Sequence, residues 1–214
     1  TYTRPALSFL AEGVFSQDEH PPYSADILRT PGYPLFLAAV WFLGRTRSAV
    51  AVAAVQVLLS TFAVSLVYAT GLRLGGRRAA LAAGLLLALE PMSAALPSYL
   101  LSDAFYQFIV ALWLFCLVGY LEARSWSWLL AASALAGLSL YVRPVGLLFP
   151  VATAVVAAAS SGAAVRARAA QATAALLVPA AIIFPWCLRN HLAADTWEFT
   201  TIASQNMLRY RAAK

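Results

Sequence analysis

The sequence predicts an all-α, multi-pass transmembrane helical bundle with juxtamembrane helices on its external side. Of its 214 residues, 62% are hydrophobic and only 11% are charged, whereas soluble domains carry about a quarter of charged residues. Long apolar runs follow one another, and short connections that carry arginines separate them. Charged residues this scarce cannot cover the surface of a globular protein in water. We therefore expect lipid to solvate much of the surface.

The net charge of +6 comes from 15 Lys and Arg against 9 Asp and Glu. In a soluble protein this balance would favour nucleic acid as a partner, but here the arginines lie between apolar runs and indicate membrane topology. We therefore expect membrane lipids and no nucleic acid as partners. Cys116 and Cys187 both lie inside apolar runs and form no disulfide framework.

Residues 1–47 predict an external loop with juxtamembrane helices. A short helix is expected over 4–12, ending at Gly13, and prolines punctuate the stretch that follows. The apolar run 33–43 is too short to cross a bilayer, which takes about 20 residues. Its aromatic residues favour an interfacial helix that lies along the membrane surface.

Residues 48–188 predict the bundle itself, in a single domain of about six spans. The expected spans are 48–70, 78–97, 101–121, 126–142, 145–161 and 169–188. Their many Ala and Gly residues suit close packing of helices. Residues 189–214 are interpreted as the start of another external loop. The chain starts at Thr1 without a signal peptide, so we expect a fragment of a longer protein.

Alternate connections carry the positive charge, which predicts that they are cytoplasmic. The arginines concerned are Arg73, Arg77, Arg78, Arg124, Arg166 and Arg168. The external side then holds residues 1–47, the turns at 97–103 and 141–144, and the tail from Arg189. Arg45 and Arg47 oppose this assignment, but three alternating connections outweigh them.

Polar residues that could carry chemistry gather on the predicted external side. Charged groups at the ends of spans are costly and tend to face a cavity. The residues that this side receives are Arg29, Asp103, Arg143, Arg189, Asn190 and His191.

Two interpretations stay open for each main candidate. Asp103 either complements the positive end of a helix, with Ser102 or Asp103 as the cap, or serves as a functional acid. Arg143, before Pro144, either reaches outward as a snorkelling side chain or faces a cavity and binds phosphate. The same pair of interpretations applies to Arg189.

Other motifs predict structure rather than catalysis. Glu90 precedes Pro91 inside the second span, where we expect a bend and a structural ion pair with an arginine. His20 and His191 are isolated histidines, for which ordinary polar surface is the simpler interpretation. No metal-binding, Walker, G-x-G-x-x-G or G-x-S-x-G spacing occurs, so metal sites, nucleotide-driven transport and serine-hydrolase chemistry have no support.

Several segments, in order, resemble the family 39 glycosyltransferases of the GT-C membrane fold, which include protein O-mannosyltransferases and the lipid A aminoarabinose transferase. The R-x-P-G-Y-P pattern at 29–34 is the most telling, and the order and spacing across nearly the whole chain make the case. The segments are RPALSFLAEGVFS at 4–16, RTPGYPLFLA at 29–38, LRLGGRRAALAAGLLLALEP at 72–91, LLSDAFYQFIVAL at 100–112, YVRPVGLL at 141–148, PWCLRN at 185–190 and NMLRYRAA at 206–213.

The resemblance implies a glycosyltransferase in the bacterial inner membrane, with an active site that faces the periplasm or exterior. Its donor would be a polyprenyl-phosphate-linked sugar and its acceptor a lipid such as lipid A, a protein or another glycan, with no cofactor. Asp103 matches the family's second acidic position, Arg143 the R-P position and Arg189 the R-N position. The arginines, with Arg29, would bind the donor phosphate, and Tyr33, Asn190 and His191 would line the acceptor cavity.

The family's principal catalytic aspartate would stand just before Thr1, so we expect this fragment alone to be inactive. A transporter or lipid flippase, and a catalytically dead paralogue, remain as alternatives. A transporter would place its charged groups midway along discontinuous helices, whereas most of those found here gather at one side.

Overall fold

The computed structural model describes residues 2–159, 164–202 and 207, and in this part of the chain it is helical without strands. The elements are α1 (Thr3–Glu12), α2 (Gly32–Gly44), α3 (Ala49–Leu89), α4 (Pro91–Ala95), η1 (Leu96–Ser98), α5 (Asp103–Ala123), α6 (Trp126–Val142), η2 (Pro144–Leu147), α7 (Leu148–Ala159) and α8 (Val165–Ala194). The predicted fold class, an all-α membrane bundle, is confirmed.

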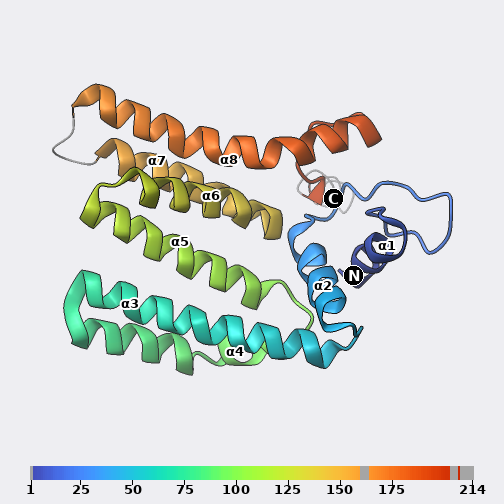
Figure 1. Ribbon diagram of the computed structural model, residues 1–214, viewed down its shortest axis with the longest axis horizontal. Coiled ribbons are helices and arrows are strands. Elements are labelled where there is room, and N and C mark those ends of the chain that lie inside the picture. Colours follow the sequence, from blue (N-terminus) through green and yellow to red (C-terminus); the bar gives the residue numbers. More distant parts are fainter. Residues whose placement is uncertain (1, 160–163, 203–206, 208–214) are drawn as a thin grey trace.

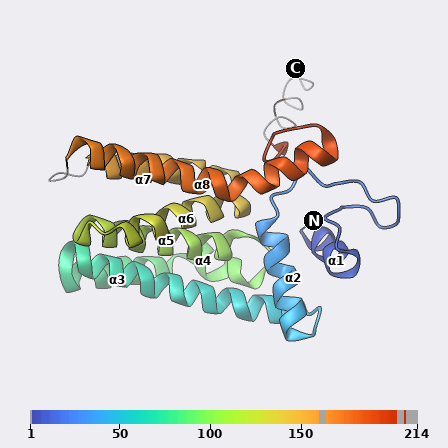
Figure 2. The same cartoon turned by 45° about the horizontal axis from the view of Figure 1, so that its top comes forward.

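Helices α3, α5, α6, α7 and α8 run side by side along the length of the molecule, whereas α2 crosses one end of them and α1 lies beyond it (Figures 1 and 2). Within the described residues, α3, α5 and α8 are long and apolar enough to cross a membrane. The shorter apolar helices are α2, α6 and the stretch Pro144–Ala159. Helix α2 occupies the run that the sequence predicts as an interfacial helix.

Helix α3 is a hairpin of two helices that meet at Gly76. The backbone there has φ 71° and ψ −170°, a conformation that glycine adopts without steric cost. After this turn the chain runs back along itself, so that Gly71 lies against Ala80 and Gly84 against Tyr68. The predicted connection between the first two spans is therefore confirmed.

The second predicted span, 78–97, is not one continuous helix, and the bend expected at Glu90 and Pro91 is a complete break between α3 and α4. Pro91 disfavours the helical conformation of the residue before it, and Glu90 is extended with φ −67° and ψ 117°. Its carboxylate accepts hydrogen bonds from the backbone amides of Met92 and Ser93 and so caps α4. The expected ion pair of Glu90 with an arginine is wrong, since the carboxylate serves as a helix cap.

The remaining predicted spans differ from the structure mainly at their ends. Helix α6 has the predicted bounds, since Ser125 caps its start and Arg143 with Pro144 ends it. Helix α7 begins only after η2, which opens with Pro144. Helix α8 continues past both predicted ends and includes Arg189, Asn190 and His191. Predicted span positions 160 and 161, and the predicted loop at 203–206 and 208–214, lie outside the described residues.

The arginine-bearing connections gather at one end of the bundle, opposite α1 and α2 (Figure 1). The Gly76 turn, the α5–α6 connection and the start of α8 all lie there. Arg73 on α3 is 3.7 Å from the Glu122 carboxylate on α5, and its guanidinium lies 4.0 Å from the centre of the Phe115 ring. These contacts join the α3 hairpin to α5 at this end of the molecule.

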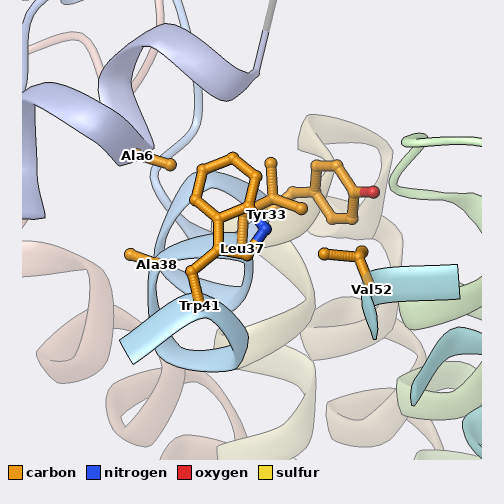
Figure 3. Packing of buried hydrophobic residues seen from close by; sticks show 6 residues of the cluster. All are labelled: Ala6, Tyr33, Leu37, Ala38, Trp41 and Val52. Carbon is orange, nitrogen blue, oxygen red and sulfur yellow. The ribbon is translucent and has the colours of Figure 1, made fainter. Parts of the chain in front are cut away.

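At the opposite end, α1 and α2 pack on the start of α3 around a small apolar core. Tyr33, Leu37 and Trp41 of α2 face Ala6 of α1 and Val52 of α3 (Figure 3). Helix α1 ends at Gly13, whose φ of 69° forms a left-handed cap, so the helix predicted over 4–12 is confirmed. This packing fixes α2 across the end of the bundle.

Gly32→Ala is expected to destabilise the protein by about 1–2 kcal/mol, the lower part of the range for overpacking. A methyl group at this position would lie 2.6 Å from the backbone carbonyl atoms of Tyr141. Both contacting segments are backbone, so neither can move aside easily. Thermal unfolding of the purified full-length protein checks this. Gly44→Ala is the matched control, because a methyl there meets only the side chain of Thr46 at 3.3 Å; equal effects of the two changes would contradict the prediction.

Candidate functional site

The centre of the site is an ion pair between the start of α5 and the end of α6. Arg143 follows the last residue of α6 in an extended conformation (φ −145°, ψ 133°), as a residue before proline favours. Its Nη2 donates to Oδ2 of Asp103 at 2.7 Å, and its Nε donates to Oγ of Ser102 at 3.0 Å. The antiparallel packing of α5 and α6 thus brings together residues that are about 40 positions apart.

The side chains of Ser102 and Asp103 accept hydrogen bonds from Arg143 rather than from the backbone amides of α5. Ser102 occupies the N-cap position of α5, but its side chain accepts no hydrogen bond from the helix. Its hydroxyl accepts from Arg143 instead. The side-chain capping interpretation is therefore wrong, although Asp103 in the first turn still complements the positive end of the helix dipole.

The ion pair is half-open, since the Arg143 side chain is 36% exposed and that of Asp103 is 26% exposed. A guanidinium has five N–H donors in one plane, and Ser102 and Asp103 engage those along its Nε–Nη2 edge. The Arg143 guanidinium also lies 5.7 Å from the centre of the Tyr106 ring. Ser102 and Asp103 thus fix the orientation of the guanidinium, a group whose geometry suits phosphate.

The helices that carry this ion pair also border an apolar groove with a volume of about 690 Å³, whose lining includes neither Asp103 nor Arg143. It lies between α2, α5 and α6, with one contribution from α8, and its lining has almost no polar surface. Phe105, two residues after Asp103, and Val142, directly before Arg143, both line it. The lining residues are Gly32, Leu35, Phe36, Ala39, Phe105, Phe108, Ile109, Leu112, Leu135, Leu138, Tyr141, Val142 and Ile182. A charged pair that lies close along the chain to an apolar groove is an arrangement that can bind an amphiphile with an anionic head.

Arg189 lies elsewhere and fastens the segment between α1 and α2 to α8. Its Nη1 donates to the backbone carbonyl of Asp26 at 2.9 Å, and its Nη2 donates to that of Phe15 at 3.1 Å. The guanidinium also stacks over the Trp186 ring, at 4.7 Å from its centre. In the part of the chain that the structure describes, no hydrogen bond or ion pair joins Arg189 to the Asp103–Arg143 pair.

Asn190 and His191 bind the chain that follows α8. Asn190 is fully buried, and its Nδ2 donates to the carbonyls of Glu198 at 2.9 Å and Phe199 at 3.2 Å. The His191 ring stacks on Trp197 with 4.4 Å between ring centres, and its Nδ1 lies 3.4 Å from a carboxylate oxygen of Asp195. Both side chains thus contact their own loop in this structure.

Arg29 and Tyr33 complete the predicted set. The Arg29 guanidinium lies 5.1 Å from the centre of the Tyr2 ring, and its buried Nε has no hydrogen-bond partner among the described residues. Tyr33 is fully buried in the α1–α2–α3 core (Figure 3), where its hydroxyl donates to Oε1 of Gln56 at 2.6 Å. The structure therefore unites Asp103 with Arg143 and places the other predicted residues in separate contacts.

Gln56 is a site-forming residue that the sequence reasoning missed. Its amide is fully buried and donates to the carbonyls of Pro97 at 2.9 Å and Tyr99 at 2.7 Å. It thereby fixes the irregular segment that leads directly into Ser102 and Asp103. A lone glutamine in an otherwise apolar span was the available signal, because a polar side chain in a membrane helix needs a partner.

Metal ligands do not gather anywhere in the described residues, where no three His, Cys, Asp or Glu side chains lie close enough together to hold an ion. The site thus consists of an arginine fork, a carboxylate, a serine hydroxyl and an apolar groove, all in a bundle of membrane helices.

Comparison with known protein families shows which family this chain belongs to. The family model described as dolichyl-phosphate-mannose-protein mannosyltransferase matches residues 28–188, well over half of the chain. The chain therefore belongs to this family, and it is a membrane glycosyltransferase of the GT-C type. No curated protein and no solved structure matches it. The matched range contains the Asp103–Arg143 pair and the whole lining of the groove.

Proposed function

We propose that this protein transfers a sugar from a polyprenyl-phosphate donor to an acceptor hydroxyl at the non-cytoplasmic face of the membrane. The observation that carries the proposal is Arg143, whose guanidinium is held by Ser102 and Asp103 and which directly follows Val142, a residue that lines the apolar groove. The groove would hold the first isoprene units of the donor, and Arg143 would bind its phosphate. Family membership supports this assignment.

In the proposed reaction, the acceptor hydroxyl oxygen forms a bond to the anomeric carbon and the bond from that carbon to the phosphate oxygen breaks. The electron pair of the broken bond stays on the phosphate, and the hydroxyl proton passes to a general base. Arg143 would stabilise the charge that develops on the leaving phosphate, an effect that is largest when the donor groups are fixed in advance. Ser102 and Asp103 fix them here.

Asp103 has two roles in this proposal. Its Oδ2 accepts from Arg143, which orients the guanidinium. Its Oδ1 would face the acceptor hydroxyl as an acid–base partner. Arg189 and Asn190 would act at a distance, by holding the external segments over the site, and Arg29, Tyr33 and His191 remain candidates for contact with the phosphate or the acceptor.

The acceptor would be a lipid such as lipid A, a protein or a glycan. The full-length protein in nanodiscs, supplied with a panel of polyprenyl-phosphate sugars, tests the donor assignment. Release of polyprenyl phosphate in step with glycosylation of an acceptor is the expected result. Consumption of a nucleotide sugar in place of every lipid-linked donor would contradict it, and movement of lipid across the bilayer without any sugar transfer would favour a flippase.

The orientation belongs to the same proposal: the arginine-bearing end would be cytoplasmic and the α1–α2 end external, in a bacterial inner membrane. Cysteines at exposed Arg77 and Ala194, in a protein with Cys116 and Cys187 replaced by alanine, report on the two ends. An impermeant maleimide added to intact spheroplasts should label position 194 and leave position 77 unlabelled until the membrane is opened. The opposite labelling pattern would invert the topology.

A further inference from the structure

The turn between α2 and α3 presents two arginines that the proposed reaction does not use. Arg45 has a left-handed backbone conformation (φ 47°, ψ 35°), and its amide donates to the carbonyls of Phe42 and Trp41. The Thr46 amide also donates to the Trp41 carbonyl, at 3.2 Å. The turn is therefore fixed by backbone hydrogen bonds, and it holds Arg45 and Arg47 exposed on either side of Thr46.

A hollow of about 630 Å³ lies beside these arginines. Leu10 of α1 and Trp41, Phe42 and Leu43 of α2 line it together with Arg45 and Arg47, and its lining includes no carboxylate. Within the described residues, neither arginine forms an ion pair. Two arginines without an ion-pair partner among the described residues thus border this largely apolar hollow, and Arg47 also lines a second hollow that contains Glu12, Asp18 and Glu19.

The position along the chain places this turn at the edge of the membrane. Helix α3, an apolar span, begins at Ala49, and the next residue, Val50, is 77% exposed. Phe42 and Leu43 are 72% and 79% exposed, so they lie where lipid can cover them. Arg45 and Arg47 precede the span by a few residues, which corresponds to the depth of the lipid headgroups.

We propose that this hollow binds the headgroup phosphate of an anionic phospholipid from the surrounding leaflet. Arg45 and Arg47 would bind the phosphate, for which the guanidinium fork is suited, and Phe42 and Leu43 would insert among the acyl chains. An anionic lipid is favoured over a zwitterionic one because the lining carries two positive charges and no negative one.

The hollow beside Arg45 and Arg47 is separate from the apolar groove. Leu35, Phe36 and Ala39 of α2 line the groove, whereas the hollow is lined by the last turn of the helix. The phospholipid would hold α2 across the end of the bundle and so support one wall of the groove. It would also account for positive charge at the end of the molecule where the alternating connections do not predict it.

Photo-crosslinking of the full-length protein in nanodiscs tests the proposal. The probe is phosphatidylglycerol with a photoactivatable group in its headgroup, and the cross-linked peptides are mapped by mass spectrometry. Wild-type protein should be labelled within 41–50, and R45Q/R47Q should lose about nine-tenths of that label, the order expected for the loss of two phosphate-binding charges. R45K/R47K should keep an intermediate level, which separates loss of charge from loss of fold.

The control variant R77Q/R78Q removes two exposed arginines at the opposite end and should leave labelling within 41–50 unchanged. Unlabelled phosphatidylglycerol should compete with the probe at this segment, and phosphatidylcholine should not. Three results would overturn the proposal. They are undiminished labelling of R45Q/R47Q, equal competition by both phospholipids, and displacement by polyprenyl phosphate at lower concentration than by phosphatidylglycerol, which would make the hollow a second donor site.

Discussion

Arg143→Ala in the full-length protein is expected to lower the rate of sugar transfer by about 10²-fold or more, the effect of removing a fixed donor from a developing anion. Arg143 is held by Ser102 and Asp103 and directly follows Val142, which lines the apolar groove, and no shorter side chain can reach the same place. The fold should persist, because a half-exposed ion pair contributes only about 0–1 kcal/mol to stability. Initial rates with a polyprenyl-phosphate sugar, alongside thermal unfolding, measure both.

The matched control for this change is Arg124→Ala. Arg124 also ends a helix, α5, but it stands at the opposite end of the bundle and stacks near Tyr120. The Arg124→Ala protein should transfer sugar at the wild-type rate. Arg143→Lys should fall between, since an ammonium keeps the charge and loses the fork. Wild-type turnover in Arg143→Ala would move the phosphate-binding role away from this site.

Asp103 can be separated from Arg143 by a double-mutant cycle. If Asp103 acts only by orienting the guanidinium, Asp103→Asn should add little loss once Arg143 is alanine. If its carboxylate also takes part in proton transfer, the two losses should multiply. Asp103→Asn alone should reduce transfer more than Asp103→Glu, because glutamate keeps the negative charge. Equal effects of Asn and Glu would leave Asp103 with neither of these roles.

The contact between Asp103 and Arg143 was within reach of the sequence. Two consecutive spans joined by a short connection pack antiparallel, so the start of one lies beside the end of the next. The contacts of Arg189 could not be predicted from the sequence in the same way. It binds the carbonyls of Phe15 and Asp26, which are 174 and 163 residues away. Backbone carbonyls carry no residue-specific signal, so no pattern in the sequence marks them as partners.

Helix bounds followed from the sequence wherever one local signal decided them. Gly76 permits the left-handed turn of α3, and Ser125 and Pro144 delimit α6. A bend at Glu90 and Pro91 was predicted, but a complete break was not, because hydropathy continues through it, whereas Pro91 and the capping carboxylate end the helix. Apolar length and backbone hydrogen bonding compete at such a position, and the hydrogen bonds decide.

Gln56→Leu is expected to destabilise the protein by about 2–4 kcal/mol, from buried groups that lose their partners. Gln56 is fully buried and joins α3 to α2 through the Tyr33 hydroxyl and to η1 through the carbonyls of Pro97 and Tyr99. Leucine fills a similar volume but satisfies none of these groups. Irregular backbone inside a membrane bundle persists only where its polar groups are paired, so the segment before Ser102 should loosen.

This loosening should also lower the rate of sugar transfer, since the same segment positions Ser102 and Asp103 for Arg143. Gln107→Leu is the matched control, because its amide donates to a single partner, the half-buried Ser93 hydroxyl at 3.0 Å. Tyr33→Phe removes one bond of the Gln56 network and should lie between the two in thermal unfolding. A Gln56→Leu protein as stable as Gln107→Leu, with unchanged sugar transfer, would mean that α2 packing alone holds the segment. The buried amide would then be dispensable, although it is the polar group that links three helical elements at this end of the bundle.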